Sequence, residues 1–216
     1  MSMGILGKKL GMTQWYDEKG ILHPVTVIAT GPCAVLQKKS PEKEKYAAYQ
    51  IGFDERKEKN ISTPLKGHFK KAKSTPKAFI REFRANADEN FNVGDVITVA
   101  RFKPGEFVDI IGISKGKGFQ GVVRRHRFAG GGAAHGSKAH RRPGAIGQRA
   151  WPGRIWKNVR MPGHMGSVHI TTQNLPVLQV RESENLLLVR GSVPGSEGSY
   201  LVIRPAIKKT ALKKKP

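Results

Sequence analysis

Residues 115–166 hold the side chains best suited to binding a polyanion. This window of 52 residues carries twelve Lys and Arg, four His and twelve Gly. It lies inside a longer run, residues 110–181, that contains no Asp or Glu, although the chain has 16 acidic residues in all. A solvated surface normally mixes both signs of charge, so this pattern indicates contact with a polyanion. The twelve cations are Lys115, Lys117, Arg124, Arg125, Arg127, Lys138, Arg141, Arg142, Arg149, Arg154, Lys157 and Arg160.

Aromatic side chains alternate with these cations and favour RNA as the polyanion. Guanidinium groups pair with phosphates, aromatic rings stack on unpaired bases, and glycine allows close backbone approach. The aromatics are Phe119, Phe128, Trp151 and Trp156. A disordered basic linker is the alternative, but such linkers rarely carry two Trp and repeated Gly-Pro turn signals. We predict that Trp151 contacts RNA at a turn, whereas for Trp156 both packing and RNA contact stay open.

The four histidines of the window do not predict a metal site. Their spacings of 9, 5 and 24 residues match no zinc pattern, and neither Cys nor a carboxylate is nearby. The histidines are His126, His135, His140 and His164. We interpret them as contacts to phosphate or base, and we expect no metal and no cofactor.

Residues 112–118, GISKGKG, resemble a nucleotide-binding loop only superficially. The spacing is one residue short, and Gly118 stands where Ser or Thr would hold magnesium. Lys115 and Lys117 are therefore predicted to meet backbone phosphates, helped by a helix that starts near Phe119. Catalysis needs a positioned acid or base, which the acid-free run cannot supply unless Asp95 or Asp109 reaches in. We expect a protein that is not an enzyme and has no small-molecule substrate.

Composition supports a nucleic-acid partner over a membrane. The chain has 216 residues, 39 Lys and Arg and a formal net charge of +23. Such a surplus points to a nucleic acid or an anionic membrane, but no apolar run approaches 18 residues and no basic amphipathic helix appears. The N-terminus lacks the apolar stretch of a signal peptide. Cys33 is the only cysteine, so a reducing compartment is expected, which suggests the cytoplasm.

Short strands are predicted on both sides of the window. Residues 14–16 and 21–29 suggest a hairpin across residues 17–20, with His23-Pro24 marking an edge or a bulge. Further strands are expected at 33–38, 46–53, 96–99, 107–113, 167–172, 177–181, 186–189 and 200–203, and a short helix is expected from Thr63-Pro64. Residues 119–125 suggest about two helical turns with Phe119, Val122 and Val123 facing a core.

The simplest architecture is a mainly β protein, a closed barrel with a long loop between two of its strands. The expected division is a barrel body at residues 1–53, 93–114 and 167–207, and a small α+β insertion at 54–92. An extended basic RNA-binding loop covers 115–166, and a basic tail covers 208–216.

Two other functions are compatible with the charge. A DNA-compacting protein would show little preference for RNA, and no DNA-reading motif is visible. An RNA-modifying enzyme would need a local carboxylate that the window lacks. Competition binding separates the first from an RNA-binding protein, and replacement of single histidines tests the second.

Several sequence blocks resemble the ribosomal protein L3 family, the third protein of the large ribosomal subunit, of the bacterial or organellar type. The blocks are MGILGKKLGMTQ from Met3, GISKGKGFQGVVRRHRFAGG from Gly112, HGSKAHRRPGAIG from His135, MPGHMG from Met161 and NLLLVRGSVPGSEGS from Asn185. They span nearly the whole chain in family order.

The resemblance implies a six-stranded translation-protein-type β-barrel with an inserted α+β part. It also implies a structural constituent of the large subunit that binds 23S-type rRNA near its 3′ end, early in assembly. The long loop would reach toward the peptidyl transferase centre, where the RNA performs the catalysis. Expected neighbours are the fourteenth and nineteenth large-subunit proteins, on a cytoplasmic or organellar ribosome. The predicted rRNA contacts are the twelve cations above together with Lys8, Lys9, His126, His135, His140, Gln148, Trp151 and His164.

The predicted loop tip, residues 147–153, departs from some family members. Bacterial members that carry a methylated glutamine have it two positions after the one matching Gln148, where this chain has Ala150. That modification is therefore not expected. Trp156 stands where Phe is more usual, and Asn158-Val159 stands where Gly-Lys is more usual, which removes one cation.

Overall fold

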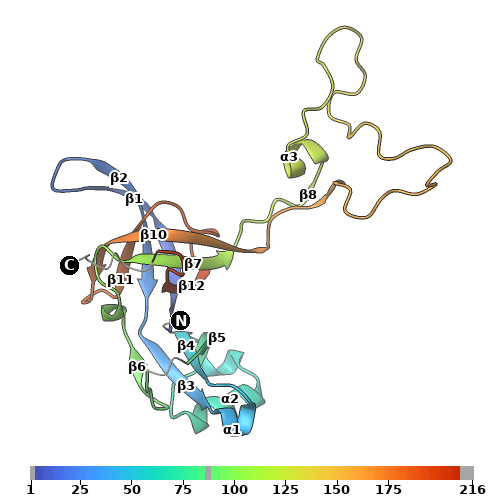
Figure 1. The fold of residues 1–216 in the computed structure, drawn as a ribbon. Helices are drawn as coiled ribbons and strands as arrows, with labels where there is room; N and C mark the ends of the chain where they lie inside the picture. Colours follow the sequence, from blue (N-terminus) through green and yellow to red (C-terminus); the bar gives the residue numbers. More distant parts are fainter. Residues whose placement is uncertain (1–2, 86–88, 210–216) are drawn as a thin grey trace. The chain divides into compact units, whose positions relative to one another are not determined.

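Six antiparallel strands form a closed barrel in the computed structural model, which describes residues 3–85 and 89–209. The chain divides into two compact units, which we call the body (residues 3–113 and 169–209) and the loop unit (Ser114–Val168). The barrel lies in the body (Figure 1). Its strands, in order around the barrel, are β1 (Ile5–Tyr16), β12 (Tyr200–Pro205), β7 (Phe107–Ile113), β10 (His169–Arg181), β11 (Leu186–Arg190) and β2 (Leu22–Thr30). The predicted mainly β fold is confirmed.

Alternating β-branched and long aliphatic side chains fill the barrel. Ile5 of β1 faces Ile203 of β12, which in turn faces Ile110 of β7. All three are fully buried, as are Ile28 and Leu187 on the opposite strands. Each fully buried side chain of this size contributes about 1.5–3 kcal/mol, so the core explains why these short strands close on themselves.

The predicted hairpin at the start of the chain is confirmed. Tyr16 pairs with Leu22, and the turn is fixed by Asp17, whose Oδ1 accepts hydrogen bonds from the backbone N–H groups of Lys19 at 2.9 Å and Ile21 at 2.8 Å. Among the described strands, β1 pairs beyond Lys9 with β2 alone, so this end projects as a two-stranded ribbon (Figure 1). The bulge lies in β1, between Lys9 and Gly11, and Pro24 fits the edge position that was its other predicted role, since the pairing of β2 with β11 ends at Val25.

A second sheet stands beside the barrel and corrects the expected division of the chain. Its strands, in order, are β5 (Lys77–Arg84), β4 (Ala48–Glu55), β3 (Cys33–Lys39) and β6 (Val96–Ile97). The strands expected at 33–38 and 46–53 exist, but they belong to this sheet and not to the barrel. The second sheet therefore begins at Cys33, whereas the insertion was expected to begin at residue 54. The reason is register, since β3 and β4 pair with each other from Ala34–Gly52 to Lys39–Ala48.

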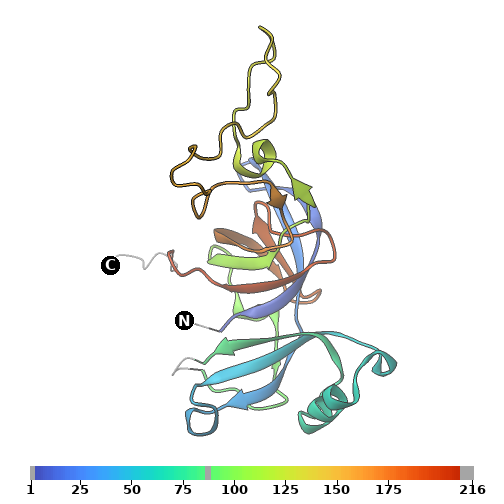
Figure 2. The same cartoon turned by 90° about the vertical axis from the view of Figure 1, so that its right-hand side faces the viewer.

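Short helices complete the second sheet, which Figure 2 shows below the barrel. They are α1 (Pro41–Glu44), α2 (Thr63–Lys71) and the 3-10 turns η1 (Glu58–Asn60) and η2 (Val99–Arg101). The helix predicted from Thr63-Pro64 is confirmed. Pro64 lies in its first turn, and Phe69 is its buried residue. The strand expected at 96–99 ends at Ile97, because the chain turns into η2.

Asp54 joins the two sheets of the body. Its Oδ2 accepts hydrogen bonds from the Tyr200 hydroxyl at 2.9 Å and from Lys8 Nζ at 3.2 Å. Burial favours the neutral acid, but these hydrogen bonds outweigh that effect and lower the pKa of Asp54 from 3.8. A carboxyl whose pKa is depressed on folding stabilises the protein above its unfolded pKa, and this contribution is lost as the pH falls through its folded pKa.

Replacing Asp54 with Asn should therefore remove an acid-sensitive part of the stability. Asn tolerates the left-handed backbone at this position, where φ is +59°. Because Lys8 and Asp54 are 38% and 34% exposed, the expected loss at pH 7 is about 0.5–1 kcal/mol. Urea unfolding at pH 7 and near pH 3 measures it, and the difference between wild type and variant should shrink at the lower pH. An equal difference at both pH values would contradict this role of Asp54.

Candidate nucleic-acid interface

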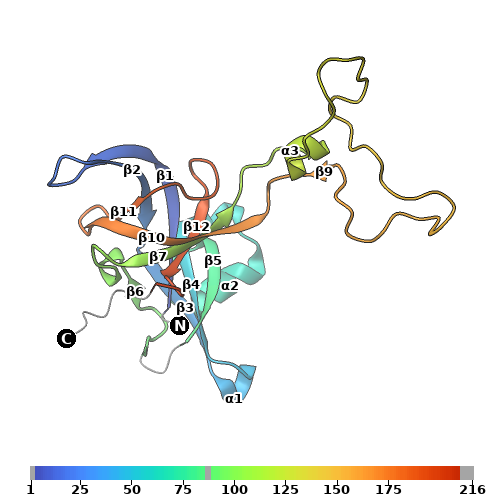
Figure 3. The ribbon, with the colours of Figure 1, turned by 45° about the horizontal axis from the view of Figure 1, so that its top comes forward.

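The loop unit is closed at its base by backbone hydrogen bonds between its two ends. We call this base the neck, residues 114–120 and 163–168. The Ser114 N–H donates to the Val168 carbonyl at 2.9 Å, the Lys117 N–H to Met165 at 2.9 Å, and the Met165 N–H to Gly118 at 3.0 Å. β8 (Phe119–Gln120) and β9 (Gly163–His164) extend the pairing. The neck holds the two legs of the segment together, as Figure 3 shows beside α3 (Val122–His126).

Two predicted RNA contacts, Arg125 and His126, bind the chain itself. Arg125 Nη1 donates to the Met161 carbonyl at 2.7 Å, and His126 Nε2 donates to the same oxygen at 3.1 Å. Gly163 provides the space, since a Cβ atom there would lie 2.7 Å from Arg125 Nη1. Both side chains are half-buried. The sequence missed this role because the partners lie about 35 residues away along the chain.

The short helix predicted in the window exists, but it buries fewer of the predicted residues than expected. α3 covers five residues, Val122 is 1% exposed, and Val123 is half-buried. The expectation that Phe119 faces a core is wrong, because 76% of this residue is exposed. It lies in β8, before the helix begins, so the helical spacing does not include it.

Eleven of the twelve cations in the window are exposed and have no acidic partner in the loop unit, because residues 114–168 contain no carboxylate side chain. They are Lys115, Lys117, Arg124, Arg127, Lys138, Arg141, Arg142, Arg149, Arg154, Lys157 and Arg160. No ion pair within this unit therefore has to be broken before these side chains meet phosphates.

Exposed aromatic rings accompany the cations near the predicted tip. Trp151 is 79% exposed, which agrees with a role outside any core. Trp156 is 48% exposed, and the Arg154 guanidinium lies 5.5 Å from the centroid of its ring. A guanidinium over an indole forms a cationic stacking platform of the kind that accepts a nucleobase. Arg154 also lines a hollow of about 290 Å³, together with Ile146, Gly147, Gln148, Arg149, Gly153 and Ile155.

The remaining histidines are surface groups. His135 and His164 are exposed, and His140 Nδ1 donates to the Gly132 carbonyl at 2.8 Å. Within residues 3–85 and 89–209, no three side chains of His, Cys, Asp or Glu gather closely enough to hold a metal ion. In the same residues, no helix is both long and apolar enough to cross a membrane.

Lys8 and Lys9, also predicted as RNA contacts, are occupied within the body. Lys9 is 7% exposed, and its Nζ donates to the carbonyls of Val193 at 3.2 Å and Gly195 at 3.1 Å. Lys8 forms the ion pair with Asp54 described above. Both lysines therefore stabilise the body. The alternation of inward side chains from Ile5 through Gly7 to Lys9 was the signal that could have shown it.

The expected basic tail falls partly within the described residues. Lys208 and Lys209 are exposed, and Lys209 Nζ lies 4.6 Å from the centroid of the Phe107 ring. Residues 210–216 of that tail lie outside the described residues.

Replacing Gly166 with Ala should open the neck. A Cβ atom at this position would lie 2.2 Å from the Lys115 carbonyl oxygen, and φ is +80°. Backbone strain alone costs about 1–3 kcal/mol, and the clash adds to it. Amide hydrogen exchange at Lys117 and Met165 should therefore accelerate by about tenfold or more.

Gly118→Ala is the matched control for this experiment. Its φ is +66°, but no atom lies within 4 Å of the added Cβ. It should accelerate exchange less than Gly166→Ala does. Equal exchange in the two variants would show that the close approach at Gly166 does not hold the neck together.

A barrel that carries an acid-free unit with exposed cations and aromatics is typical of nucleic-acid-binding proteins. Comparison with known proteins is more specific. The family model described as ribosomal protein L3 matches residues 82–186. The chain belongs to this family, since relatives of nearly the same length are almost half identical to it.

Three relatives illustrate the similarity, and each is named large ribosomal subunit protein uL3. The relative from Alkaliphilus metalliredigens is 48% identical over 95% of this chain and 98% of its own length. The relative from Deinococcus radiodurans is 49% identical over 97% and 98%. The relative from Halalkalibacterium halodurans is 49% identical over 96% and 99%.

Proposed function

We propose that this chain is a structural constituent of the large ribosomal subunit and binds its 23S-type RNA directly through the loop unit. Family membership supports the first part, since the relatives are named as large-subunit proteins. The composition of the loop unit supports the second part, direct binding of RNA. Its eleven exposed cations, without any carboxylate, suit the close-packed phosphates of a folded RNA.

The neck gives this binding its geometry. Because the neck ties the two legs together, the exposed cations are presented by one closed segment and not by two independent arms. Lys115 and Lys117 contact phosphates at its base, and Arg149, Trp151 and Arg154 contact RNA near its tip. The RNA needs only neutralisation and positioning here, so no side chain of the unit has to react.

Further features of the role follow from the family resemblance. The chain binds near the 3′ end of the RNA early in assembly, and its loop unit reaches toward the peptidyl transferase centre. The fourteenth and nineteenth large-subunit proteins are its neighbours. The bacterial relatives favour a cytoplasmic ribosome, with an organellar ribosome as the alternative.

Competition binding tests the proposal. Folded large-subunit ribosomal RNA and duplex DNA of equal length are titrated against the full chain at several salt concentrations. We expect the RNA to bind about a thousandfold more tightly than the DNA, as specific sites generally do relative to non-specific ones. Equal affinity would favour a DNA-compacting protein and would overturn the proposal.

A further inference from the structure

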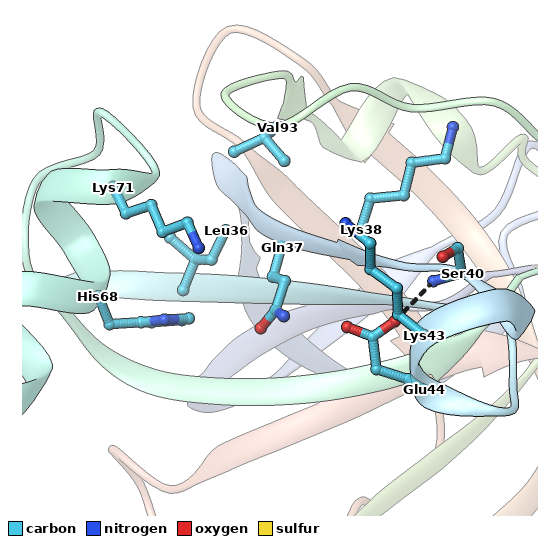
Figure 4. A pocket seen from close by; sticks show the side chains of 9 residues that line it. All are labelled: Leu36, Gln37, Lys38, Ser40, Lys43, Glu44, His68, Lys71 and Val93. Atoms are coloured by element: carbon cyan, nitrogen blue, oxygen red, sulfur yellow. Dashed lines mark hydrogen bonds between the residues drawn. The ribbon is translucent and has the colours of Figure 1, made fainter.

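A cavity in the body lies apart from the loop unit in sequence and carries its own surplus of positive charge. It has a volume of about 440 Å³ and opens over the second sheet between α1 and α2. Figure 4 shows the residues of β3, α1 and α2 that line it, with the Lys38 side chain turned away from His68 and Lys71. The volume falls within the range of about 300–1,000 Å³ that is usual for small-molecule sites.

Three lysines from three different elements line this cavity. Lys38 lies on β3, Lys43 on α1 and Lys71 on α2, and all three are exposed. None of them forms an ion pair with a described acidic residue, and Lys38 Nζ donates only to the neutral Oδ1 of Asn90, at 2.6 Å. Within the described residues, the ammonium groups of Lys43 and Lys71 have no counter-charge, so this lining favours an anion.

A single acid lines the cavity, and it is already engaged. Oε2 of Glu44 accepts a hydrogen bond from the Ser40 N–H at 3.1 Å, shown as the dashed line in Figure 4. Three lysines and one glutamate leave a surplus of two positive charges along the lining. That surplus favours a phosphate group over a neutral ligand.

Part of the cavity lining is apolar or aromatic and suits a flat ring. Leu36 is 3% exposed, Val93 lies across from it, and both line the cavity. The half-buried His68 ring points inward from α2. A hydrogen bond of 2.6 Å between His68 Nε2 and Gln50 Oε1 fixes its position. An imidazole ring beside aliphatic side chains can stack on a nucleobase. An inorganic anion has no flat ring and would leave this part of the cavity unused.

We propose that this cavity binds one unpaired nucleotide of RNA. The phosphate lies between Lys43 and Lys71, and the base lies against Leu36 and His68. The inference rests on the proposed function in so far as the ligand is RNA, but it assigns a second contact that does not involve the loop unit. An acidic peptide would use the lysines and leave the ring and the apolar lining without a partner.

NMR titration of the full chain tests the ligand chemistry. The probes are adenosine 5′-monophosphate, inorganic phosphate and a hexaglutamate peptide. We expect the nucleotide to shift amide signals around the cavity saturably and to bind more tightly than either other probe. Equal binding of inorganic phosphate, tighter binding of the peptide, or no shift of these signals by the nucleotide would each overturn the inference.

A pair of double variants tests the lysines. Lys43→Gln/Lys71→Gln should weaken nucleotide binding by about tenfold, and the salt slope for single-stranded RNA should fall by about 0.7 for each lysine that no longer meets a phosphate. The control is Lys57→Gln/Lys59→Gln, which removes the same charge from exposed residues outside the cavity. An equal effect of both pairs would overturn the inference. Both pairs should keep the wild-type melting temperature, because all four side chains lie on the surface.

Crosslinking separates this inference from the proposed function. Large-subunit ribosomal RNA containing 4-thiouridine is irradiated with the full chain, and the crosslinked peptides are mapped. We expect crosslinks both in residues 114–168 and around the cavity, with the cavity crosslinks absent in Lys43→Gln/Lys71→Gln. Crosslinks in residues 114–168 alone would overturn the inference and leave the proposed function intact. Crosslinks in neither place would overturn both.

Discussion

Replacing Arg141, Arg142, Arg149 and Arg154 with Gln is expected to lower the affinity for large-subunit ribosomal RNA by about a hundredfold near physiological salt. The four side chains are exposed and face no carboxylate within the loop unit, so each is available to a phosphate. The slope of log affinity against log salt should fall by about 2.8, at 0.7 for each contact on a single strand. Filter binding or fluorescence anisotropy over a salt series measures both quantities.

The control for this experiment removes four exposed lysines from the body. Their side chains form no ion pair in the described structure and give the same change in net charge when replaced with Gln; the four are Lys19, Lys57, Lys59 and Lys103. We expect this variant to lose less than tenfold in affinity, because it lowers only the long-range electrostatic attraction between the protein and the RNA. If both variants bind equally weakly, the position of the charge does not matter and the loop unit is not the principal contact.

Replacing Asp109 with Ala is expected to destabilise the body by about 3 kcal/mol. Asp109 is 1% exposed, and its oxygens accept from the backbone N–H groups of Asn174 at 3.0 Å and Ile207 at 3.3 Å. Arg204 Nε lies 3.9 Å away. The change leaves two donors without an acceptor and a partly buried guanidinium without its counter-charge. It also removes the hydrogen bond from Asn174 that fixes the β-bulge of β10 between Thr172 and Leu175.

Thermal and urea unfolding measure this effect. For a chain of this size, 3 kcal/mol corresponds to a fall in melting temperature of about 6–12 °C. Glu197→Ala serves as the control, because this exposed acid has no hydrogen bond or ion pair in the described structure, and it should change stability by less than about 0.5 kcal/mol. Similar stability of the two variants would show that Asp109 does not hold the barrel strands together.

The limits of the loop unit could be predicted from the sequence because composition changes sharply there. Acidic residues stop at Asp109, regular alternation stops after Ile113, and both features are local. The structure begins the unit at Ser114 and ends it at Val168, one and two residues outside the predicted limits. Strand and helix positions such as β7 and α2 were predictable for the same reason, because a short-range pattern determines them.

Pairing partners could not be predicted in the same way. The pattern at β3 and β4 indicates strands, but it does not say that they pair with each other in a second sheet. Lys9 is a similar case, because its carbonyl partners lie more than 180 residues along the chain. Arg125 and His126 look like RNA contacts by type, and only the fold brings Met161 to them. All of these contacts join residues that are distant in sequence, and such contacts leave no local pattern.

Sedimentation with ribosomal subunits is the most direct test of the central claim. The full chain, carrying a small tag, is added to an assembling large subunit, and the particles are washed at high salt and separated on a gradient. A structural constituent that binds RNA through the loop unit should stay with the large subunit in near-equal amount, and the four-arginine variant should wash off. Release of the wild-type chain by the wash, or equal recovery with the small subunit, would contradict the account.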